Sequence, residues 1–294
     1  MVCDKIIDGK KISADIKEEI KKETTELKDS TGIIPGLAFI IVGENPASKV
    51  YVRSKGKACD ELGFYSDTRM LPSSASEAEL LSMIISLNED ENIHGILVQL
   101  PLPEHINEEK IIEAISFVKD VDGFHPQNVG RLAIGSKGFL PCTPYGIIEL
   151  LKRSKVETKG KNAVIIGRSN IVGKPVAGLM LRKEINSTVT VCHSATRDIA
   201  EVTSSADIII AAIGKAEFLK ADMIKEGCVI IDVGINRIED ALAKNGYRIT
   251  GDVDFNSCLE KCSKITPVPG GVGPMTIAML MKNTICSAQG LIYG

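Results

Sequence analysis

The sequence predicts an α/β protein with two domains, each built around a parallel β-sheet. Short apolar runs typical of buried strands alternate with longer segments of helical periodicity, and this alternation indicates parallel strands joined by right-handed crossovers. The alternation pauses between residues 101 and 144, where Pro, Gly and short polar turns gather, and then resumes. A chain of 294 residues is long for one core and sufficient for two.

The first domain is predicted to cover residues 1–145. Its opening helix carries Ile12, Ile16, Ile20 and Leu27 on one face, which is the spacing of an amphipathic helix. Further helices are expected at 48–62, with Ser48 as the N-cap and Gly63 as the stop signal, and at 76–88. Strands are expected at 36–43, near 67–70 and at 94–100.

The second domain is predicted to cover residues 146–273, and a helix at 145–154 leads into it. Short apolar runs bounded by turn residues predict its strands at 163–167, 188–192, 207–212, 228–234 and 265–268. The last helix is expected at about 275–289. We predict that the segment 274–294 returns to the first domain.

Composition narrows the class of partner. The net charge is −3 and the sequence pI about 5.9, so no surface for nucleic acid is expected. No apolar run approaches the ~20 residues that span a bilayer, and charges occupy the first residues, where a secretory signal needs an apolar stretch. The eight cysteines, which form no C-x-x-C pair, are interpreted as small core residues in a reducing compartment, and no metal site is predicted. The expected location is the cytoplasm.

A glycine turn follows the strand at 163–167, where AVIIG continues through RSNIVG into a helix. Gly167 allows a tight turn at the strand end, and Gly173 allows the helix to pack closely against the sheet. Helix N-terminal amides and the helix dipole favour a phosphate at such a turn. Because the G-x-G-x-x-G spacing is missing, the turn alone is a weak signal for a Rossmann-like nucleotide site.

The end of the next strand discriminates between nicotinamide cofactors. An NAD site usually places Asp or Glu about 20 residues further on, where it holds the ribose hydroxyls. Here TVTVC is followed by HSATR, and the first carboxylate is Asp198, which suits the N-cap of another helix. Together with Arg168, the residues Ser194 and Arg197 predict a site for an extra phosphate and therefore NADP. The alternative is that both arginines are solvated surface charges.

Two other strand ends belong to the same rim, because ligands bind outside the carboxyl ends of parallel strands. Gly214 follows DIIIAAI, and the segment GIN that begins at Gly234 follows CVIIDV. The bare backbone of these glycines would let a flat ring approach closely. The loop TPVPGGVGPMT at 266–276 has two interpretations, a rigid ligand wall or a simple connector.

In the first domain, Tyr51 and Lys55 stand four apart on one helix face, where a phenol and an amine can form a hydrogen-bonded pair. Burial would lower the pKa of the lysine; the alternative is a surface lysine beside a half-buried tyrosine. Gln99 lies near the end of an apolar strand and needs either a ligand or a structural partner. Asp120 and Asp122 in KDVDG indicate a turn, or a carboxylate that grips an amidine-like edge.

Several phrases resemble the bifunctional methylenetetrahydrofolate dehydrogenase/cyclohydrolase family. They occur in the family's order, span nearly the whole chain and are highly specific: VGENPASKVYVRSKGKACDELG, GILVQLPLP, KDVDGFHPQNVGRL, PCTPYG, GRSNIVGKPVA, TVTVCHSAT and ITPVPGGVGPMT. The resemblance implies two α/β domains, the second Rossmann-like, with a folate cleft between them and NADP on the second. It also implies oxidation of methylenetetrahydrofolate and hydrolysis of the methenyl product, in one-carbon metabolism and purine biosynthesis, by a homodimer that acts on tetrahydrofolate derivatives.

The resemblance assigns roles residue by residue. Lys55 matches the catalytic lysine, and Tyr51 matches its hydrogen-bonded, pterin-stacking neighbour. Gln99 matches the amide that positions Lys55, and Asp122 the carboxylate that holds the pterin's amino edge. The implied cofactor contacts are Gly167, Arg168, Ser169, Ser194 and Ile235, to which the strand-end argument adds Gly214. The expected substrate contacts also include Leu100, Pro269, Gly270, Gly271, Val272 and Gly273.

Two residues depart from the family's pattern, and two other functions compete. Ala195 stands where many relatives carry a basic residue, which weakens the phosphate contact, and Gln127 is not the residue expected after FHP. A shikimate-type NADP dehydrogenase would need its own substrate signature, which the Tyr51/Lys55 pair does not supply. A folate-binding protein without catalysis would not need the pair of Lys55 and Gln99.

Overall fold

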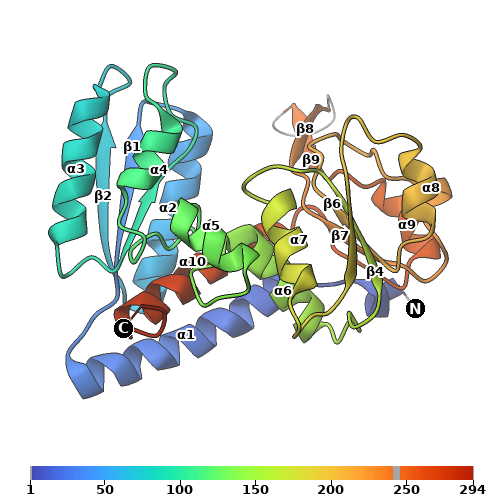
Figure 1. Ribbon diagram of the computed structural model, residues 1–294, viewed down its shortest axis with the longest axis horizontal. Coiled ribbons are helices and arrows are strands. Elements are labelled where there is room, and N and C mark those ends of the chain that lie inside the picture. Colours follow the sequence, from blue (N-terminus) through green and yellow to red (C-terminus); the bar gives the residue numbers. More distant parts are fainter. Residues whose placement is uncertain (1, 241–245, 294) are drawn as a thin grey trace. The chain divides into compact units, whose positions relative to one another are not determined.

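The computed structural model describes residues 2–240 and 246–293 and divides into two units (Figure 1). The five-stranded unit comprises the segment up to Ser13 together with Thr143–Thr276. The three-stranded unit comprises Ala14–Cys142 together with the segment from Ile277 onward. Each unit is therefore made of two pieces that are far apart in the sequence. Helices α1 (Gly9–Thr31) and α10 (Val272–Ala288) contribute residues to both.

The three-stranded unit is built on a parallel sheet in the order β2-β1-β3. The central strand β1 (Gly36–Val42) is buried along its whole length, as expected for the apolar run GLAFIIV in a parallel sheet covered on both faces. The edge strands are β2 (Tyr65–Leu71), which mixes exposed and partly buried residues, and β3 (Gly95–Val98). The strands predicted at 36–43, 67–70 and 94–100 are all found, and β2 is longer than predicted.

Helices cover this sheet and build the core of the unit. Besides parts of α1 and α10, they are α2 (Pro46–Leu62), α3 (Glu77–Glu89), α4 (Glu108–Ala114) and α5 (Pro126–Ala133). α3 and α4 pack on one face of the sheet, where alternate residues of β1 meet a row of helix residues: Ala38, Ile40, Val42, Leu80, Ile84, Leu87 and Ile111. This alternation follows from the two-residue period of a strand.

Two helix starts test the capping predictions. The predicted N-cap Ser48 is wrong: Ser48 lies inside α2, and its backbone N–H donates to Asn45 Oδ1 at 3.2 Å. Asn45 can supply that acceptor because α2 begins at Pro46, a residue that needs no N–H partner in the first turn. α3 begins where predicted, with Ser76 and Glu79 in a capping box. α4 and α5 are additions to the prediction, since their short spans lie in the stretch interpreted as turns.

The five-stranded unit contains a parallel sheet in the order β10-β7-β6-β4-β5. Its strands are β4 (Asn162–Ile166), β5 (Thr188–Cys192), β6 (Ile208–Ala211), β7 (Val229–Asp232) and β10 (Lys264–Ile265), so each strand predicted for this part of the chain is found. β5 pairs on one side of β4, and the later strands follow on the other side. The direction in which strands are added therefore reverses at β4, and ligands bind at the carboxyl ends of strands at such a point.

Short helices and a hairpin complete this unit. They are η1 (Val2–Lys5), α6 (Cys142–Arg153), α7 (Gly173–Leu181), α8 (Ile199–Ser204), η2 (Ala221–Met223), α9 (Phe255–Lys261) and the antiparallel pair β8 (Asn236–Glu239) and β9 (Tyr247–Thr250). α6 and α10 each begin three residues before their predicted starts. Pro144 and Pro274 then lie in the first helical turn, where proline is tolerated because no intrahelical N–H bond is required.

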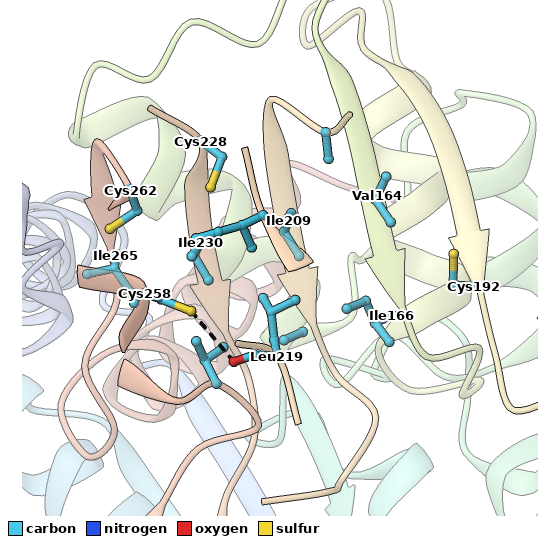
Figure 2. Close-up of a cluster of buried hydrophobic side chains, with 14 residues drawn as sticks. Val164, Ile166, Cys192, Ile209, Leu219, Cys228, Ile230, Cys258, Cys262 and Ile265 are labelled. Atoms are coloured by element: carbon cyan, nitrogen blue, oxygen red, sulfur yellow. Dashed lines mark hydrogen bonds between the residues drawn. The ribbon is translucent and has the colours of Figure 1, made fainter. Parts of the chain in front are cut away.

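Cysteines form part of the core of the five-stranded unit (Figure 2). Cys228, Cys258 and Cys262 are buried among isoleucines and valines, and Cys258 Sγ donates to the Leu219 carbonyl at 3.6 Å. Burial raises the pKa of Cys228 to about 12 and that of Cys258 to about 11. The interpretation as core residues is confirmed for these and for the other buried thiols, whereas Cys286 is only partly buried and the side chain of Cys3 lies outside the described residues.

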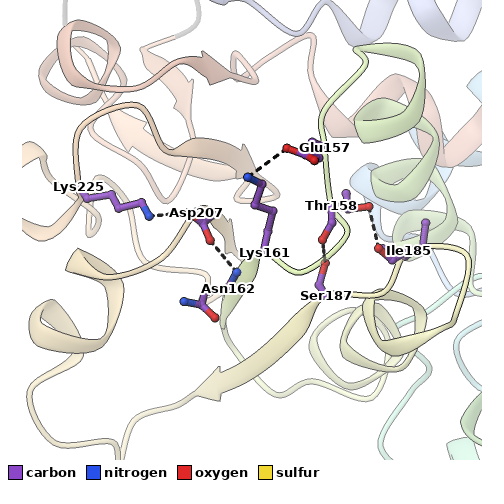
Figure 3. Close-up of polar contacts among 8 residues, drawn as sticks. All are labelled: Glu157, Thr158, Lys161, Asn162, Ile185, Ser187, Asp207 and Lys225. Carbon is purple, nitrogen blue, oxygen red and sulfur yellow. Dashed lines mark hydrogen bonds and ion pairs between the residues drawn. The ribbon is translucent and has the colours of Figure 1, made fainter.

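Polar contacts close the amino end of the five-stranded sheet (Figure 3). The Asn162 N–H at the start of β4 donates to Asp207 Oδ2 at 2.8 Å, and Lys225 pairs with the same carboxylate. Ser187 Oγ, just before β5, donates to the Thr158 carbonyl at 2.8 Å. The polar groups of Asp207, Lys225 and Ser187 at this end of the sheet are thus already bonded within the protein. In the described parts of the chain, none of the helices has the length and apolar character needed to cross a membrane.

Candidate active site

Lys55 is a buried amine with a fixed partner. It lies on α2 with only 7% of its surface exposed, and its Nζ donates to Gln99 Oε1 at 3.1 Å. Gln99 is held on both sides, because its backbone N–H donates to the Ile40 carbonyl at 2.9 Å and its Nε2 donates to the Leu100 carbonyl at 2.7 Å. The amide oxygen of Gln99 therefore faces Lys55. The structure brings Lys55, Gln99 and Leu100 together at the carboxyl end of β3.

Burial and a neighbouring carboxylate act in opposite directions on Lys55. Burial lowers the pKa of Lys55, while the negative charge of Asp122 raises it. Burial likewise raises the pKa of Asp122, while Lys55 and a hydrogen bond with the Cys142 thiol lower it. The expected effect of burial on this lysine is confirmed. A lysine whose pKa is moved toward neutrality can both accept and release a proton.

The two aspartates of KDVDG have different surroundings. Asp120 accepts the N–H groups of Phe124 at 3.2 Å and His125 at 2.8 Å and the Asn128 side-chain amide at 2.8 Å, so it serves the local fold. Asp122 is partly buried and lines a hollow of about 20 Å³ with Leu100 and other residues. That volume holds no more than a water molecule. Of the pair, Asp122 is the carboxylate with capacity left to accept a ligand's hydrogen bonds.

Tyr51 differs from its expectation. The predicted hydrogen bond between Tyr51 and Lys55 is absent, because Lys55 turns to Gln99, and the Tyr51 side chain has no hydrogen-bond partner within the residues the structure describes. Tyr51 is 45% exposed although it lies one turn before Lys55 on α2. The four-residue spacing brings the two side chains to one helix face but does not fix their polar atoms. An exposed ring remains available for stacking.

Cys142 is a site residue that sequence reasoning missed. Its Sγ donates to the Val121 carbonyl at 3.4 Å, and burial together with Asp122 raises the pKa of the thiol well above its usual range. The residue belongs to the phrase PCTPYG, which supports the resemblance, but no spacing rule connects it with Lys55. Because the thiol stays neutral and donates to the backbone, it adds no charge beside Lys55 and Asp122.

In the five-stranded unit, close packing explains the glycine turn after β4. Gly167 has φ of +125°, and a Cβ on this residue would lie 2.1 Å from the Ala212 carbonyl oxygen. A Cβ on Gly173 would lie 2.2 Å from the Gly167 carbonyl oxygen. Both predicted roles, the tight turn and the close approach of α7, are confirmed. No side chain longer than hydrogen fits at either position without moving the backbone.

Ser169 and Arg168 follow Gly167 on the same turn. Ser169 Oγ accepts the backbone N–H groups of Val172 at 3.1 Å and Gly173 at 3.3 Å, so it caps the start of α7. These two amides, expected to face a phosphate, are therefore already bonded. Arg168 is exposed, and no carboxylate in the described part of the chain pairs with it. The cation rather than the helix amides is the group free to meet a phosphate at this turn.

The segment after β5 carries hydroxyl and cationic groups. Ser194 and Arg197 are exposed, and the turn is held by Thr196, whose Oγ1 accepts the His193 N–H at 2.9 Å. Asp198 occupies the N-cap position of α8 as predicted, but with φ of +47° its side chain makes no capping hydrogen bond. The residues between β5 and Asp198 thus offer donors and a cation, with no carboxylate for a ribose diol.

The strand ends after β6 and β7 complete the rim of this sheet. Gly214 has φ of +71° and open space where a Cβ would stand, and Ile235 is 56% exposed. The backbone N–H of Gly214 donates to Asp252 Oδ2 at 2.8 Å. Gly167, Arg168, Ser169, Ser194, Gly214 and Ile235 all follow carboxyl ends of this one parallel sheet. Asp252 was not predicted, because it lies after β9 in a segment, GDVD, that carries no recognised motif.

The loop predicted to contact substrate also belongs to the five-stranded unit. Lys10 N–H donates to the Gly270 carbonyl at 3.0 Å, and a Cβ on Gly9 would lie 1.8 Å from the Gly271 carbonyl oxygen. Pro269 follows a cis peptide bond, and Gly270 has φ of +111°. Val272 and Gly273 are already the first residues of α10. The segment is therefore a backbone turn fixed by the start of α1.

Comparison with known proteins matches both parts of the chain. The catalytic domain of tetrahydrofolate dehydrogenase/cyclohydrolase matches residues 7–122, and the NAD(P)-binding domain of the same enzymes matches residues 141–291. The bifunctional protein FolD of Chloroherpeton thalassium is 60% identical over 288 residues, which cover 97% of this chain and 98% of that protein.

Two crystal structures are similar over almost their full length. The bifunctional FolD methylenetetrahydrofolate dehydrogenase/cyclohydrolase of Campylobacter jejuni has a TM-score of 0.92 and 53% identity, covering 97% of this chain and 99% of that one. The enzyme of Trypanosoma brucei, solved with NADP and an inhibitor, has a TM-score of 0.92 and 40% identity, covering 98% of each chain. With both domains matched and identity this high, the chain belongs to the tetrahydrofolate dehydrogenase/cyclohydrolase family.

Proposed function

We propose that Lys55 is the proton carrier of a bifunctional enzyme of one-carbon folate metabolism. The enzyme oxidises methylenetetrahydrofolate to methenyltetrahydrofolate with NADP and hydrolyses the product to formyltetrahydrofolate. The observation that carries the proposal is the buried Lys55 amine held by Gln99 at 3.1 Å beside Asp122. The full-length similarity to folate dehydrogenase/cyclohydrolases favours this function over that of a shikimate-type dehydrogenase, and a protein that only binds folate would not need the arrangement.

The rim of the five-stranded sheet fits NADP. Arg168 and Arg197 are exposed cations, Ser194 is an exposed donor, and Gly214 has open space where a Cβ would stand. A ribose diol would need a carboxylate after β5, whereas a ribose phosphate needs the cations that are present. When bound, NADP would supply the hydride acceptor for oxidation of the one-carbon bridge to the methenyl state. Ala195 leaves Arg168 and Arg197 to supply the phosphate contact.

Hydrolysis is the step in which the chain's own side chains exchange protons. Water adds to the methenyl carbon and loses one proton. The remaining hydroxyl proton leaves as the formyl carbonyl forms, and a ring nitrogen gains a proton as its bond to that carbon breaks, so one proton is released overall. Lys55 is the group suited to these transfers, because burial lowers its pKa and Gln99 orients it. Asp122 accepts hydrogen bonds from the amino edge of the pterin, and the exposed Tyr51 ring stacks on it.

The proposal extends to the organisation of the protein. The proposed division is a folate-binding domain over 1–145 with 274–294 and an NADP-binding domain at 146–273. In the structure, the segment up to Ser13 belongs instead with the five-stranded unit. Pro269–Gly273 contacts the substrate. The proposed location is the cytoplasm, which the use of cysteines suggests, and the proposed assembly is a homodimer, which the family resemblance implies. Light scattering on the purified protein measures the number of subunits directly.

The test of the central proposal is Lys55→Met, which keeps the length and apolar stem of the side chain but removes its proton chemistry. General acid–base catalysis contributes ~10²–10⁴-fold, so cyclohydrolase activity should fall by about that factor. Dehydrogenase activity should fall less, because hydride transfer depends mainly on positioning, and the methenyl product should accumulate. Its ultraviolet absorbance, followed with NADP and methylenetetrahydrofolate, reports both the formation and the decay of the product.

Lys57→Met is the matched control. Lys57 lies on the same helix, but its side chain is 77% exposed and pairs with Glu61 at 3.7 Å. This variant should keep both activities. Normal decay of the methenyl signal in folded Lys55→Met would assign hydrolysis to another residue.

A further inference from the structure

Asp252 is a fully buried carboxylate at the rim of the five-stranded sheet, with 0% of its surface exposed. Its Oδ2 accepts the backbone N–H groups of Ile213 at 2.7 Å and Gly214 at 2.8 Å. Its Oδ1 accepts the Asn236 side-chain amide at 2.8 Å. One side chain therefore joins the segment that follows β6 to the segment that follows β7.

A second buried carboxylate supports the first. Asp232, the last residue of β7, is 3% exposed, and its Oδ1 accepts the N–H groups of Gly234 and Asp252, each at 2.9 Å. Its Oδ2 accepts the Val253 N–H at 3.1 Å. The backbone that carries the Asp252 side chain is thereby tied to the end of β7.

Two glycines make room for these carboxylates. A Cβ on Gly234 would lie 2.3 Å from Asp252 Oδ1, and a Cβ on Gly251 would lie 1.8 Å from Asp232 Oδ2. Each carboxylate thus packs against bare backbone of the segment that it holds. Buried carboxylates are expensive unless fully hydrogen-bonded, and a purely apolar core could fill this space more simply. The arrangement is explained if the function of the protein requires the segments after β6 and β7 to be held in fixed positions.

The location indicates what the loops are positioned for. A dinucleotide lies across the carboxyl ends of the strands at the switch point of such a sheet. The cationic groups Arg168 and Arg197 follow β4 and β5, on one side of the sheet. They indicate where the adenosine half of NADP, whose ribose carries the extra phosphate, would bind. The segments after β6 and β7 are on the other side, where Gly214 and Ile235 are exposed.

We propose that Asp252, through Asn236 and the amides of Ile213 and Gly214, is the positioning residue for the part of the rim that receives the nicotinamide half of NADP. The inference rests on the proposed NADP-dependent function. Asp252 touches neither cofactor nor substrate in this role; it sets the separation of two backbone segments that do. The adenosine half of NADP, bound after β4 and β5, does not depend on it.

The test compares a single variant with a double variant in which the side chains at positions 236 and 252 are exchanged, so that the net charge is restored. Asn236→Asp removes the donor and sets a second carboxylate against Asp252, so the affinity for NADP should fall at least about tenfold, or about 1.4 kcal/mol. The double variant Asn236→Asp/Asp252→Asn restores a donor–acceptor pair, because the amide at position 252 can donate to the carboxylate at position 236. Affinity should then recover although position 236 still carries the added charge.

Calorimetric titrations with NADP and with adenosine 2′,5′-bisphosphate separate positioning from general damage. The bisphosphate reports the adenosine half alone, so its affinity should be unchanged in Asn236→Asp. Unaltered NADP affinity, an equal loss for both ligands, or a double variant that does not recover would each overturn the proposal. If Asn236→Asp does not fold, Asn236→Ala removes the donor without adding charge and should show the same selective loss.

Two controls keep this test distinct from that of the proposed function. Failure of the unmodified protein to bind NADP would refute the proposed function. Equal NADP affinity of the unmodified protein and Asn236→Asp would refute only the role of Asp252. Asp207→Asn is the matched control, since Asp207 also accepts a backbone N–H but lies at the amino end of the same sheet. Cyclohydrolase activity, which needs no nicotinamide, should persist in Asn236→Asp and report an intact fold.

Discussion

At the scale of single residues, chemistry in this protein depends on pairs of groups that shift each other's properties. Lys55 illustrates the point, since burial lowers its pKa while the charge of Asp122 raises it. Gln99 contributes no charge and instead fixes the direction of the amine. The protonation of Lys55 is therefore sensitive to its neighbours, and a change at Asp122 should alter the pKa of the lysine as well.

Arg168 provides a test of cofactor selectivity at one residue. Arg168→Ala should raise the KM for NADP by the equivalent of roughly 1.5–3 kcal/mol, because a charge-assisted contact with the ribose phosphate is lost. The KM for NAD should change little, since NAD has no phosphate at that position. Steady-state kinetics with both cofactors make the comparison, and NAD serves as the control within the same variant. An equal rise for both cofactors would contradict a phosphate-specific role.

Residue roles differ in how far the sequence predicts them. Lys55 and Gln99 could be found because one lies at helical spacing on an amphipathic segment and the other near the end of a strand, where ligands bind. The hydrogen bond expected for Tyr51 is wrong, because spacing places side chains on a helix face and leaves their torsion angles open. Asp252 and Cys142 acquire their neighbours only through tertiary packing, which no local pattern encodes.

At the scale of elements, His94 links the starts of two neighbouring strands. The Gly36 N–H at the beginning of β1 donates to His94 Nδ1 at 3.0 Å, and the His94 N–H donates to the Gly36 carbonyl at 2.8 Å. Because Nδ1 accepts a hydrogen bond, the ring is neutral in the folded protein. Burial, with help from Lys119, lowers the pKa of His94 from its usual value of 6.5.

The stability of the three-stranded unit should therefore depend on pH through His94. As pH falls below about 6.5, the unfolded chain binds a proton that the folded ring resists, so the free energy of unfolding decreases. His94→Asn keeps an acceptor for Gly36 and does not titrate, so this variant should lose less stability in the same range. Urea midpoints above and below pH 6.5 measure the difference. Parallel curves for the two proteins would exclude the titration of His94 as the cause.

Elements were predictable where they are long or apolar. Each strand expected for the two parallel sheets is present, because a buried run such as GLAFIIV has few alternatives. The hairpin β8–β9 was not predicted, since its strands have four residues each and are partly exposed. α4 and α5 were missed because short helices depend more on caps, here Asn107 and His125, than on apolar periodicity.

At the scale of the whole molecule, the C-terminal segment completes the three-stranded unit. Asn283 Nδ2 donates to the Val121 carbonyl at 2.8 Å and the Leu140 carbonyl at 2.9 Å. Ser287 Oγ donates to the His94 carbonyl at 2.7 Å, and Lys282 pairs with Glu23 at 2.7 Å. The return of this segment was predicted together with the division of the chain into two α/β domains. The local sequence of α10 does not predict which backbone carbonyls accept hydrogen bonds from its side chains.

A chain that stops at Thr276 should therefore fail to form a stable three-stranded unit. Buried carbonyls that lose their donors cost ~1–3 kcal/mol each, which is a large fraction of the ~5–15 kcal/mol that stabilise a domain. Hydrogen exchange followed by mass spectrometry should show loss of protection across β1 and β3. A synthetic peptide covering residues 277–294 provides the control, because its addition should restore part of that protection. Full protection of β1 in the shortened chain would contradict the role assigned to the segment.

The interrupted layout of the two units also affects how the protein is made. During synthesis, residues 14–142 are made before the C-terminal segment that completes their unit. The stretch 143–276 must be translated in between. At ~5–20 residues per second, that stretch takes roughly 7–27 s to translate. Throughout this interval the carbonyls of Val121 and Leu140 lack their donor, Asn283. The three-stranded unit is therefore incomplete, and open to misfolding, while residues 143–276 are translated. Chaperones that bind unfinished domains would act mainly at that stage.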